Sequence, residues 1–205
     1  MTQTMSQTVE NVTVWPLRTW PKDIGVALVV ASALLLGLIL RSVVEGRTRT
    51  FESDQAGFAI SYPATWRVLE VENPLVLRVE DPQTDSIYKT NVTVEVRELD
   101  PNSPPTLQEL VDRRVAQRGE LTDYHFLSSA ERTVAGARAA VLEYAHVAQP
   151  IDTPRRMALP VVVQSREYIV VTQNRTYYIA LDAPADDFAR ASDQFDRIVQ
   201  SVRIP

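Results

Sequence analysis

The segment Thr90–Leu99 reads TNVTVEVREL and alternates Val92, Val94 and Val96 with polar residues. Successive side chains of a strand point to opposite faces of a sheet, so this period of two predicts a strand with one buried face. It is the clearest strand pattern in the chain. Its valines predict one face of a sheet core, around which the neighbouring segments are arranged.

Three shorter strand patterns precede this segment. Strands are predicted at Gly57–Tyr62, Trp66–Val71 and Leu75–Glu80. Pro63 ends the first of them, because proline has no N–H to donate to a sheet ladder. Trp66 is expected to fill the core at the edge of the sheet rather than to bind a ligand.

A helix and a hairpin follow the central segment. Thr106 and Glu109 have the spacing of a capping box, which predicts the start of a helix. Further on, Tyr124–Val134 and Ala137–Val147 flank Ala135-Gly136. Two strand patterns separated by two such residues predict a tight β-hairpin.

The end of the chain combines strands with a second helix. Strands are predicted at Leu159–Ser165, Glu167–Thr172 and Thr176–Leu181, with a turn at Asn174-Arg175. Asp186–Val202 has the apolar spacing of an amphipathic helix. The residues predicted on its buried face are Phe188, Phe195, Ile198 and Val202. Antiparallel strands with one mid-chain and one terminal helix define an α+β domain, with the helices covering the sheet.

An uninterrupted apolar run, Ile24–Leu40, precedes the domain and contains neither charge nor proline. At about 1.5 Å per residue it covers roughly 25 Å, close to the hydrocarbon thickness of a bilayer. It exceeds the usual signal-peptide core of roughly 7–15 residues, and no A-x-A-like cleavage site follows it. The sequence therefore predicts an uncleaved transmembrane helix over residues 24–44.

The residues in and beside this run suit a membrane environment. Trp15 and Trp20 are of the type that favours the bilayer interface, and Lys22 and Arg41 flank the run with charge. Small side chains within the run allow another helix to approach closely. They are Ala31, Ser32, Ala33 and Gly37. The predicted partners are the lipid bilayer, through residues 24–44, and other integral membrane subunits.

The predicted layout has four parts. Residues 1–23 form a short polar tail, 24–44 the transmembrane helix, 45–50 a linker and 51–205 the α+β domain. The basic residues on the two sides of the predicted helix differ by one, which does not decide the orientation.

The composition of the domain excludes several function classes. Residues 51–205 keep 23 of the chain's 26 acidic and 16 of its 21 basic residues, giving a net charge near −7. This balance argues against a nucleic-acid partner. The chain has no cysteine, so disulfides and thiolate metal sites are excluded. It has no phosphate-binding loop, no H-E-x-x-H and no G-x-S-x-G. We predict no catalytic residue, no cofactor and no enzymatic activity.

Two further candidates remain. If Ala135-Gly136 is the hairpin turn, residues whose numbers sum to 271 face each other, which places His125 opposite His146. Two imidazoles with Cβ atoms about 5 Å apart can share a metal ion, although a shift of one residue removes the arrangement. The adjacent Arg155 and Arg156 lie in a polar loop and are candidates for docking an acidic partner.

Two stretches resemble a known family. GFAISYPATWRV, residues 57–68, resembles the opening signature of the PsbP-like family, the fold family of the extrinsic P subunit of photosystem II. The stretch from residue 166 to residue 204 is similar to the end of that family. It has a strand, a turn, a strand, a helix with a phenylalanine pair and a final short strand.

The resemblance implies a central antiparallel sheet flanked by helices and a domain outside the cytoplasm. It also implies a non-enzymatic accessory or assembly subunit of a larger membrane complex, photosynthetic or respiratory. The expected location is the plasma membrane, with the C-terminal domain extracytoplasmic. The alternative is a tethered extracytoplasmic module that binds a small ligand or an envelope protein by itself.

Overall fold

The computed structural model describes residues 21–100, 102–149 and 159–204. For residues 21–23 and 41–45 it describes the backbone alone. The chain divides into two compact units, Met1–Val44 and Glu45–Pro205, and each is described by itself.

The described part of the first unit is one helix, α1 (Pro21–Glu45), of 25 residues. The helix predicted through the apolar run is confirmed, and every side chain from Ile24 to Leu40 is exposed. Within the described residues, no helix combines the length and the apolar character needed to cross a membrane.

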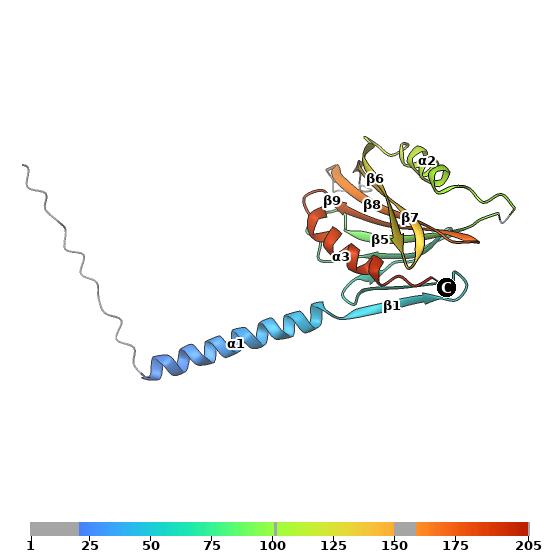
Figure 1. Ribbon diagram of the computed structural model, residues 1–205. Helices are drawn as coiled ribbons and strands as arrows, with labels where there is room; N and C mark the ends of the chain where they lie inside the picture. Colours follow the sequence, from blue (N-terminus) through green and yellow to red (C-terminus); the bar gives the residue numbers. More distant parts are fainter. Residues whose placement is uncertain (1–20, 101, 150–158, 205) are drawn as a thin grey trace, which may run out of the picture. The chain divides into compact units, whose positions relative to one another are not determined.

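The second unit is built on a seven-stranded antiparallel sheet of order β3-β4-β5-β9-β8-β7-β6 (Figure 1). The strands are β3 (Arg67–Val68), β4 (Leu75–Glu80), β5 (Asn91–Glu98), β6 (His125–Val134), β7 (Ala137–Ala148), β8 (Val161–Val171) and β9 (Arg175–Pro184). A separate ribbon pairs β1 (Thr48–Ser53) with β2 (Phe58–Pro63). The expected antiparallel α+β fold is thereby confirmed.

The main core lies between the sheet and α3 (Phe188–Gln200). Val92 and Val94 of β5 are fully buried there, as the alternation in TNVTVEVREL predicts. The predicted face of the last helix is also confirmed, with every member buried, although Val202 follows the helix end. These residues are Phe188, Phe195, Ile198 and Val202. Trp66 is buried in the same core, which confirms its predicted packing role.

The opposite face of the sheet carries α2 (Leu107–Arg118), so the two helices lie on different sides of the sheet (Figure 1). The predicted capping box is present: the Thr106 hydroxyl accepts from the Glu109 N–H at 3.2 Å. The Glu109 carboxylate accepts from the Thr106 N–H at 2.7 Å. Leu110 and Val111 form a small second core against β7, β8 and β9.

β5 is buried on both sides near its start, where a single buried face was predicted. Asn91 is 3% exposed and Glu95 is 7% exposed, although both alternate with the core valines. Arg114 of α2 donates to Glu95, whereas Asn91 donates to Tyr88 and to the carbonyl of Lys89. Sequence periodicity did not predict these contacts.

Other strand predictions are wrong in extent. β3 ends at Val68, because it lies at the sheet edge and pairs with β4 over only two residues. β8 runs without a break through Arg166, where two separate strands were predicted. Residues 48–50, predicted as linker, belong to β1. The turn before β9 lies one residue earlier than predicted, since Val171 pairs with Thr176.

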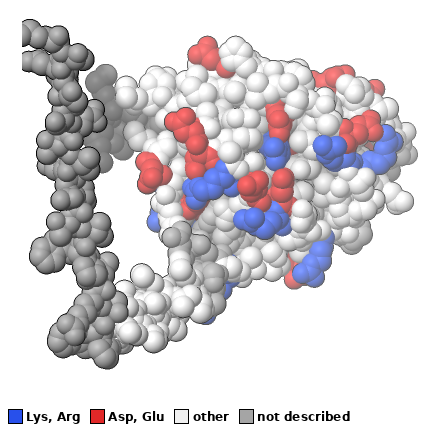
Figure 2. Space-filling view, turned by 60° about the vertical axis from the view of Figure 1, so that its left-hand side comes forward, with Lys and Arg blue, Asp and Glu red and all other residues white. Residues whose placement is uncertain are grey.

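The surface of the second unit has no extended region of one charge on the side that Figure 2 presents. Acidic and basic side chains stand next to one another there. The acidic excess of the sequence is thus distributed rather than concentrated on this face.

Candidate functional site

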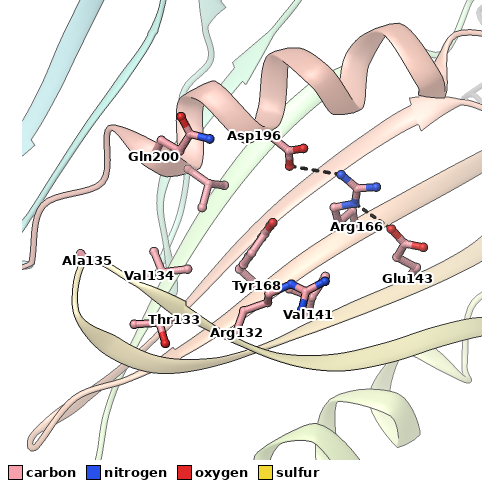
Figure 3. A pocket seen from close by; sticks show the side chains of 11 residues that line it. Arg132, Thr133, Val134, Ala135, Val141, Glu143, Arg166, Tyr168, Asp196 and Gln200 are labelled. Atoms are coloured by element: carbon pink, nitrogen blue, oxygen red, sulfur yellow. Dashed lines mark hydrogen bonds and ion pairs between the residues drawn. The ribbon is translucent and has the colours of Figure 1, made fainter.

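A groove of about 660 Å³ opens on the α3 side of the sheet, between α3 and the β6–β7 hairpin (Figure 3). It forms because α3 packs mainly on β9 and β2, and the hairpin extends beyond the area that the helix covers. The floor is made by Val141 of β7 and Tyr168 of β8. Its other lining residues are Arg132, Thr133, Val134, Ala135, Glu143, Arg166, Asp196, Val199 and Gln200.

Arg166 of β8 forms ion pairs with two carboxylates of the groove, one on β7 and one on α3. Its Nε donates to the Glu143 carboxylate at 2.7 Å, and its Nη1 donates to Asp196 on α3 at 3.2 Å (Figure 3). Burial alone would lower the pKa of Arg166, but the hydrogen bond and charge of Glu143, with the charge of Asp196, raise it. This guanidinium is therefore fully compensated inside the groove.

Arg132 is the second guanidinium of the groove and has a different environment. It is exposed on β6, and no ion pair joins it to any other described residue. Its only side-chain hydrogen bond in this part of the chain goes to the backbone carbonyl of Glu131 at 3.4 Å. A cation without a partner beside apolar side chains is suited to a ligand with an anionic group and an apolar body.

The groove also contains a phenol hydroxyl. Its lining residues include no histidine, no cysteine and no serine. Burial and the nearby Asp196 raise the pKa of the Tyr168 hydroxyl, which keeps it protonated as a hydrogen-bond donor.

The other face of the sheet holds a buried ionic network that the sequence patterns did not predict. Arg114 of α2 donates from Nε to Glu167 of β8 at 2.9 Å and from Nη2 to Glu95 of β5 at 3.0 Å. Arg118 donates to the same Glu167 oxygen at 3.1 Å. Glu167 is fully buried, and Arg114 is 5% exposed. The guanidinium of Arg114 also lies over the ring of Tyr178, 4.3 Å from its centroid.

This network fixes α2 on the sheet. Burial alone would raise the pKa of Glu167, but the charges and hydrogen bonds of Arg118 and Arg114 lower it overall. The carboxylate therefore stays ionised in the interior. One signal was present in the sequence: Arg114 stands four residues after Leu110 and three after Val111, on the apolar stripe of α2.

The predicted facing of His125 and His146 is wrong. The hairpin keeps the predicted register from Val134↔Ala137 to Ser128↔Glu143, and then a β-bulge at Leu127 shifts it by one residue. His125 consequently pairs with Ala145 and is exposed, whereas His146 is 9% exposed. Among the described residues, no three metal-ligating side chains come together.

The remaining candidate residues fall into two groups. Ala31, Ser32, Ala33 and Gly37 lie on α1 with exposed positions, so their role in helix packing stays a prediction. Trp15, Trp20, Arg155 and Arg156 lie outside the described residues. Lys22 and Arg41 belong to α1, but their side chains are outside the described part as well.

These features define the second unit as an antiparallel α+β domain with a helix on each face and a polar groove beside the terminal helix. The sequence model of the PsbP family matches residues 46–204, nearly the whole of this unit. The chain therefore belongs to the PsbP family. No curated protein sequence matches the chain.

Solved structures confirm the fold. The chain is similar to cyanobacterial PsbP (CyanoP) from Synechocystis sp. PCC 6803, with a TM-score of 0.57 and 12% identity. The match covers 77% of this chain and 92% of CyanoP. It is also similar to LpqN of Mycobacterium tuberculosis, described as involved in cell envelope biogenesis, with a TM-score of 0.54 and 12% identity. That match covers 78% of this chain and 91% of LpqN.

Proposed function

We propose that this protein is a non-enzymatic, single-pass membrane protein whose PsbP domain docks on partner subunits of a larger membrane complex. The domain would lie on the extracytoplasmic side of the plasma membrane. By family analogy the complex is photosynthetic or respiratory. The observation that carries the proposal is the apolar surface of α1, where every side chain from Ile24 to Leu40 is exposed.

The physical argument rests on what this surface would cost in water. Leaving a leucine, isoleucine or valine side chain exposed rather than buried forfeits about 1.5–3 kcal/mol each. The exposed large apolar residues of α1 range from 52% to 69% exposure. They are Ile24, Val26, Leu28, Val29, Val30, Leu34, Leu35, Leu36, Leu38, Ile39 and Leu40. A helix that is apolar all round requires lipid or other helices around it.

The residues beside the apolar run and the small residues within it have separate roles in this proposal. Trp15 and Trp20 would lie at one membrane surface, and Lys22 and Arg41 would place their charges among the headgroups. Ala31, Ser32, Ala33 and Gly37 would admit a neighbouring helix of the complex. The domain would add a second contact outside the membrane.

Membrane anchoring is tested with Leu34→Arg, near the middle of α1. An arginine at the centre of a spanning helix costs about 2.5–3.5 kcal/mol, so we expect a roughly 100-fold weaker insertion. The measurement is the fraction of full-length protein that stays in the membrane pellet after alkaline carbonate extraction. Leu159→Arg makes the same change at a 77% exposed site of the domain and should leave that fraction unchanged. Release of the unmodified protein by carbonate would contradict anchoring.

The subunit role is tested by purifying the tagged full-length chain from native membranes in mild detergent and identifying the proteins recovered with it. We expect stoichiometric recovery of other integral membrane subunits. A chain that elutes alone would contradict the subunit role.

A second function is favoured by the 660 Å³ groove and its unpaired Arg132. In this alternative, the tethered domain binds a small anionic ligand or an envelope protein by itself. The similarity to LpqN supports this alternative, because LpqN is described as involved in cell envelope biogenesis. A chain that elutes alone but binds such a ligand would support this alternative.

A further inference from the structure

The sheet has one long open edge. In the strand order, β3 ends the sheet on one side with two residues, and β6 ends it on the other side with ten. All nine residues from His125 to Thr133 are exposed. Natural edge strands are usually protected by charged side chains, proline, a bulge or a covering segment. β6 contains no proline, its bulge at Leu127 leaves the part after it regular, and its charges are confined to the adjacent Glu131 and Arg132.

Hollows lie on both faces of this edge, beside the same short stretch of β6. On the α3 face, Arg132 lines the groove of Figure 3. On the α2 face, Glu131 lines a second hollow of about 410 Å³, together with Arg138, Val171 and the start of α2. Side chains of an extended strand alternate between faces, so a strand added beside β6 would direct successive side chains into the two hollows.

The α3-side hollow has one charge that other described residues leave unpaired, Arg132, and the α2-side hollow has two, Glu131 and Arg138. No ion pair joins Glu131 or Arg132 to the rest of the described chain, whereas Arg166 and Arg114 both have carboxylate partners. Opposite charges directly across two strands stabilise their pairing, and like charges weaken it. The edge therefore favours a segment with an acidic residue opposite Arg132 and a basic residue opposite Glu131.

A second copy of β6 does not meet this requirement. In a two-fold symmetric antiparallel pair, residues that face each other lie on the same face of the joined sheet. Glu131 and Arg132 lie on opposite faces, so neither can face the other in the second copy. The symmetric registers place like charges together or leave both charges opposite neutral residues.

We propose that β6 accepts an extended segment of a partner protein as an additional strand of the sheet. This segment carries an acidic and a basic residue side by side, the acidic one beside Arg132 and the basic one beside Glu131. The proposal rests on the docking role proposed above and names the surface through which the domain docks.

The test places a photo-reactive amino acid at Ser129 or at Ala130 of the full-length chain in native membranes. These two positions directly precede the charged pair and leave it intact, and they lie on the α2 face and the α3 face respectively. Mass spectrometry then locates each adduct. We expect both positions to cross-link to neighbouring residues of one short segment in one partner. Ala116, exposed on α2, is the control position and should give no adduct with that segment.

Charge variants add a second measurement. Arg132→Glu should lower the yield of the Ala130 adduct by roughly five- to tenfold, because an attractive cross-strand pair becomes repulsive. Arg113→Glu makes the same change on the exposed side of α2 and should leave the yield unchanged.

Three results would overturn the inference: no adduct at either position, adducts scattered over unrelated sites, or adducts with a second copy of the chain. If the detergent purification recovers partner subunits while β6 gives no adduct, the inference fails and the proposed function stands. If the chain is recovered alone and β6 gives no adduct, both fail.

Discussion

Glu167 shows why the interior of this domain could not be fully predicted from its sequence. It lies in REYIVV beside Arg166, and its charge alone suggests a solvent-facing position. In the structure it is fully buried and neutralised by Arg114 and Arg118, which come from a helix about fifty residues earlier. Alternation identifies the face on which a side chain lies, but not what covers that face.

Removing this charge should destabilise the domain strongly. Glu167→Gln leaves Arg114 buried without its main counter-charge, and breaking a buried pair in this way costs about 3–5 kcal/mol. The measurement is the free energy of unfolding of the full-length protein in detergent, from urea titration followed by circular dichroism. Glu98→Gln makes the same change at the exposed end of β5 and should have little effect. Equal stability of the two variants would show that the network contributes nothing.

His146 should make stability depend on pH. Its pKa is lowered chiefly by burial, with Asp182 opposing and Arg118 adding to the effect, and its Nδ1 has no hydrogen-bond partner. A histidine whose pKa is lower in the folded state stabilises the fold above its unfolded pKa of about 6.5. That stability is lost as the pH falls below this value toward the folded pKa.

We therefore expect the free energy of unfolding to decrease between about pH 7 and pH 5, and to decrease less in His146→Phe. The measurement is urea unfolding of the full-length protein across this range. His125→Phe changes the exposed histidine and should keep the slope of the unmodified protein. If the free energy of unfolding of His146→Phe depends on pH as strongly as that of the unmodified protein, burial of His146 does not cause the dependence.

At the scale of elements, local signals predicted those parts of the fold that depend on neighbouring residues. The capping box of α2, the bounds of β4 and the hairpin turn at Ala135-Gly136 were all predicted correctly. The bulge at Leu127 was not, because nothing in HFLSSAERTV marks which residue is extra. The bulge shifts the register by one residue near the start of β6, so that His125 and His146 do not face each other.

Substitutions at the two positions of the hairpin turn should change the stability of the protein in opposite directions. Ala135 and Gly136 both have positive φ, 49° and 79°, which is the conformation of a type I′ turn. Asparagine is favoured at the first position, so Ala135→Asn should stabilise the protein by about 0.5 kcal/mol. A side chain is disfavoured at the second, so Gly136→Ala should cost about 1 kcal/mol. Because an added Cβ at Gly136 meets nothing within 4 Å, that cost is conformational. Thermal unfolding measures both, and shifts of the same sign would contradict the assignment.

At the scale of the whole molecule, the α+β class could be predicted from the strand and helix patterns along the domain, and the family from residues near its two ends. The groove beside α3 could not, because its walls come from β6, β7, β8 and α3, and its shape depends on how far α3 extends over the sheet. Arg132 and Arg166 are ordinary polar residues in the sequence. Only the tertiary arrangement distinguishes the compensated guanidinium from the free one.

The position of β9 has a consequence for how the protein is made. Among the described residues β9 is the last strand, yet it lies at the centre of the sheet between β5 and β8. Until it is synthesised, β3–β5 and β6–β8 are two half-sheets with no strand pairing between them. The core then still lacks α3, which follows β9. A nascent chain released before residue 184 would therefore hold two open sheet edges that the finished sheet lacks, on β5 and on β8, and no completed core. The domain can close only after nearly all of it has left the ribosome.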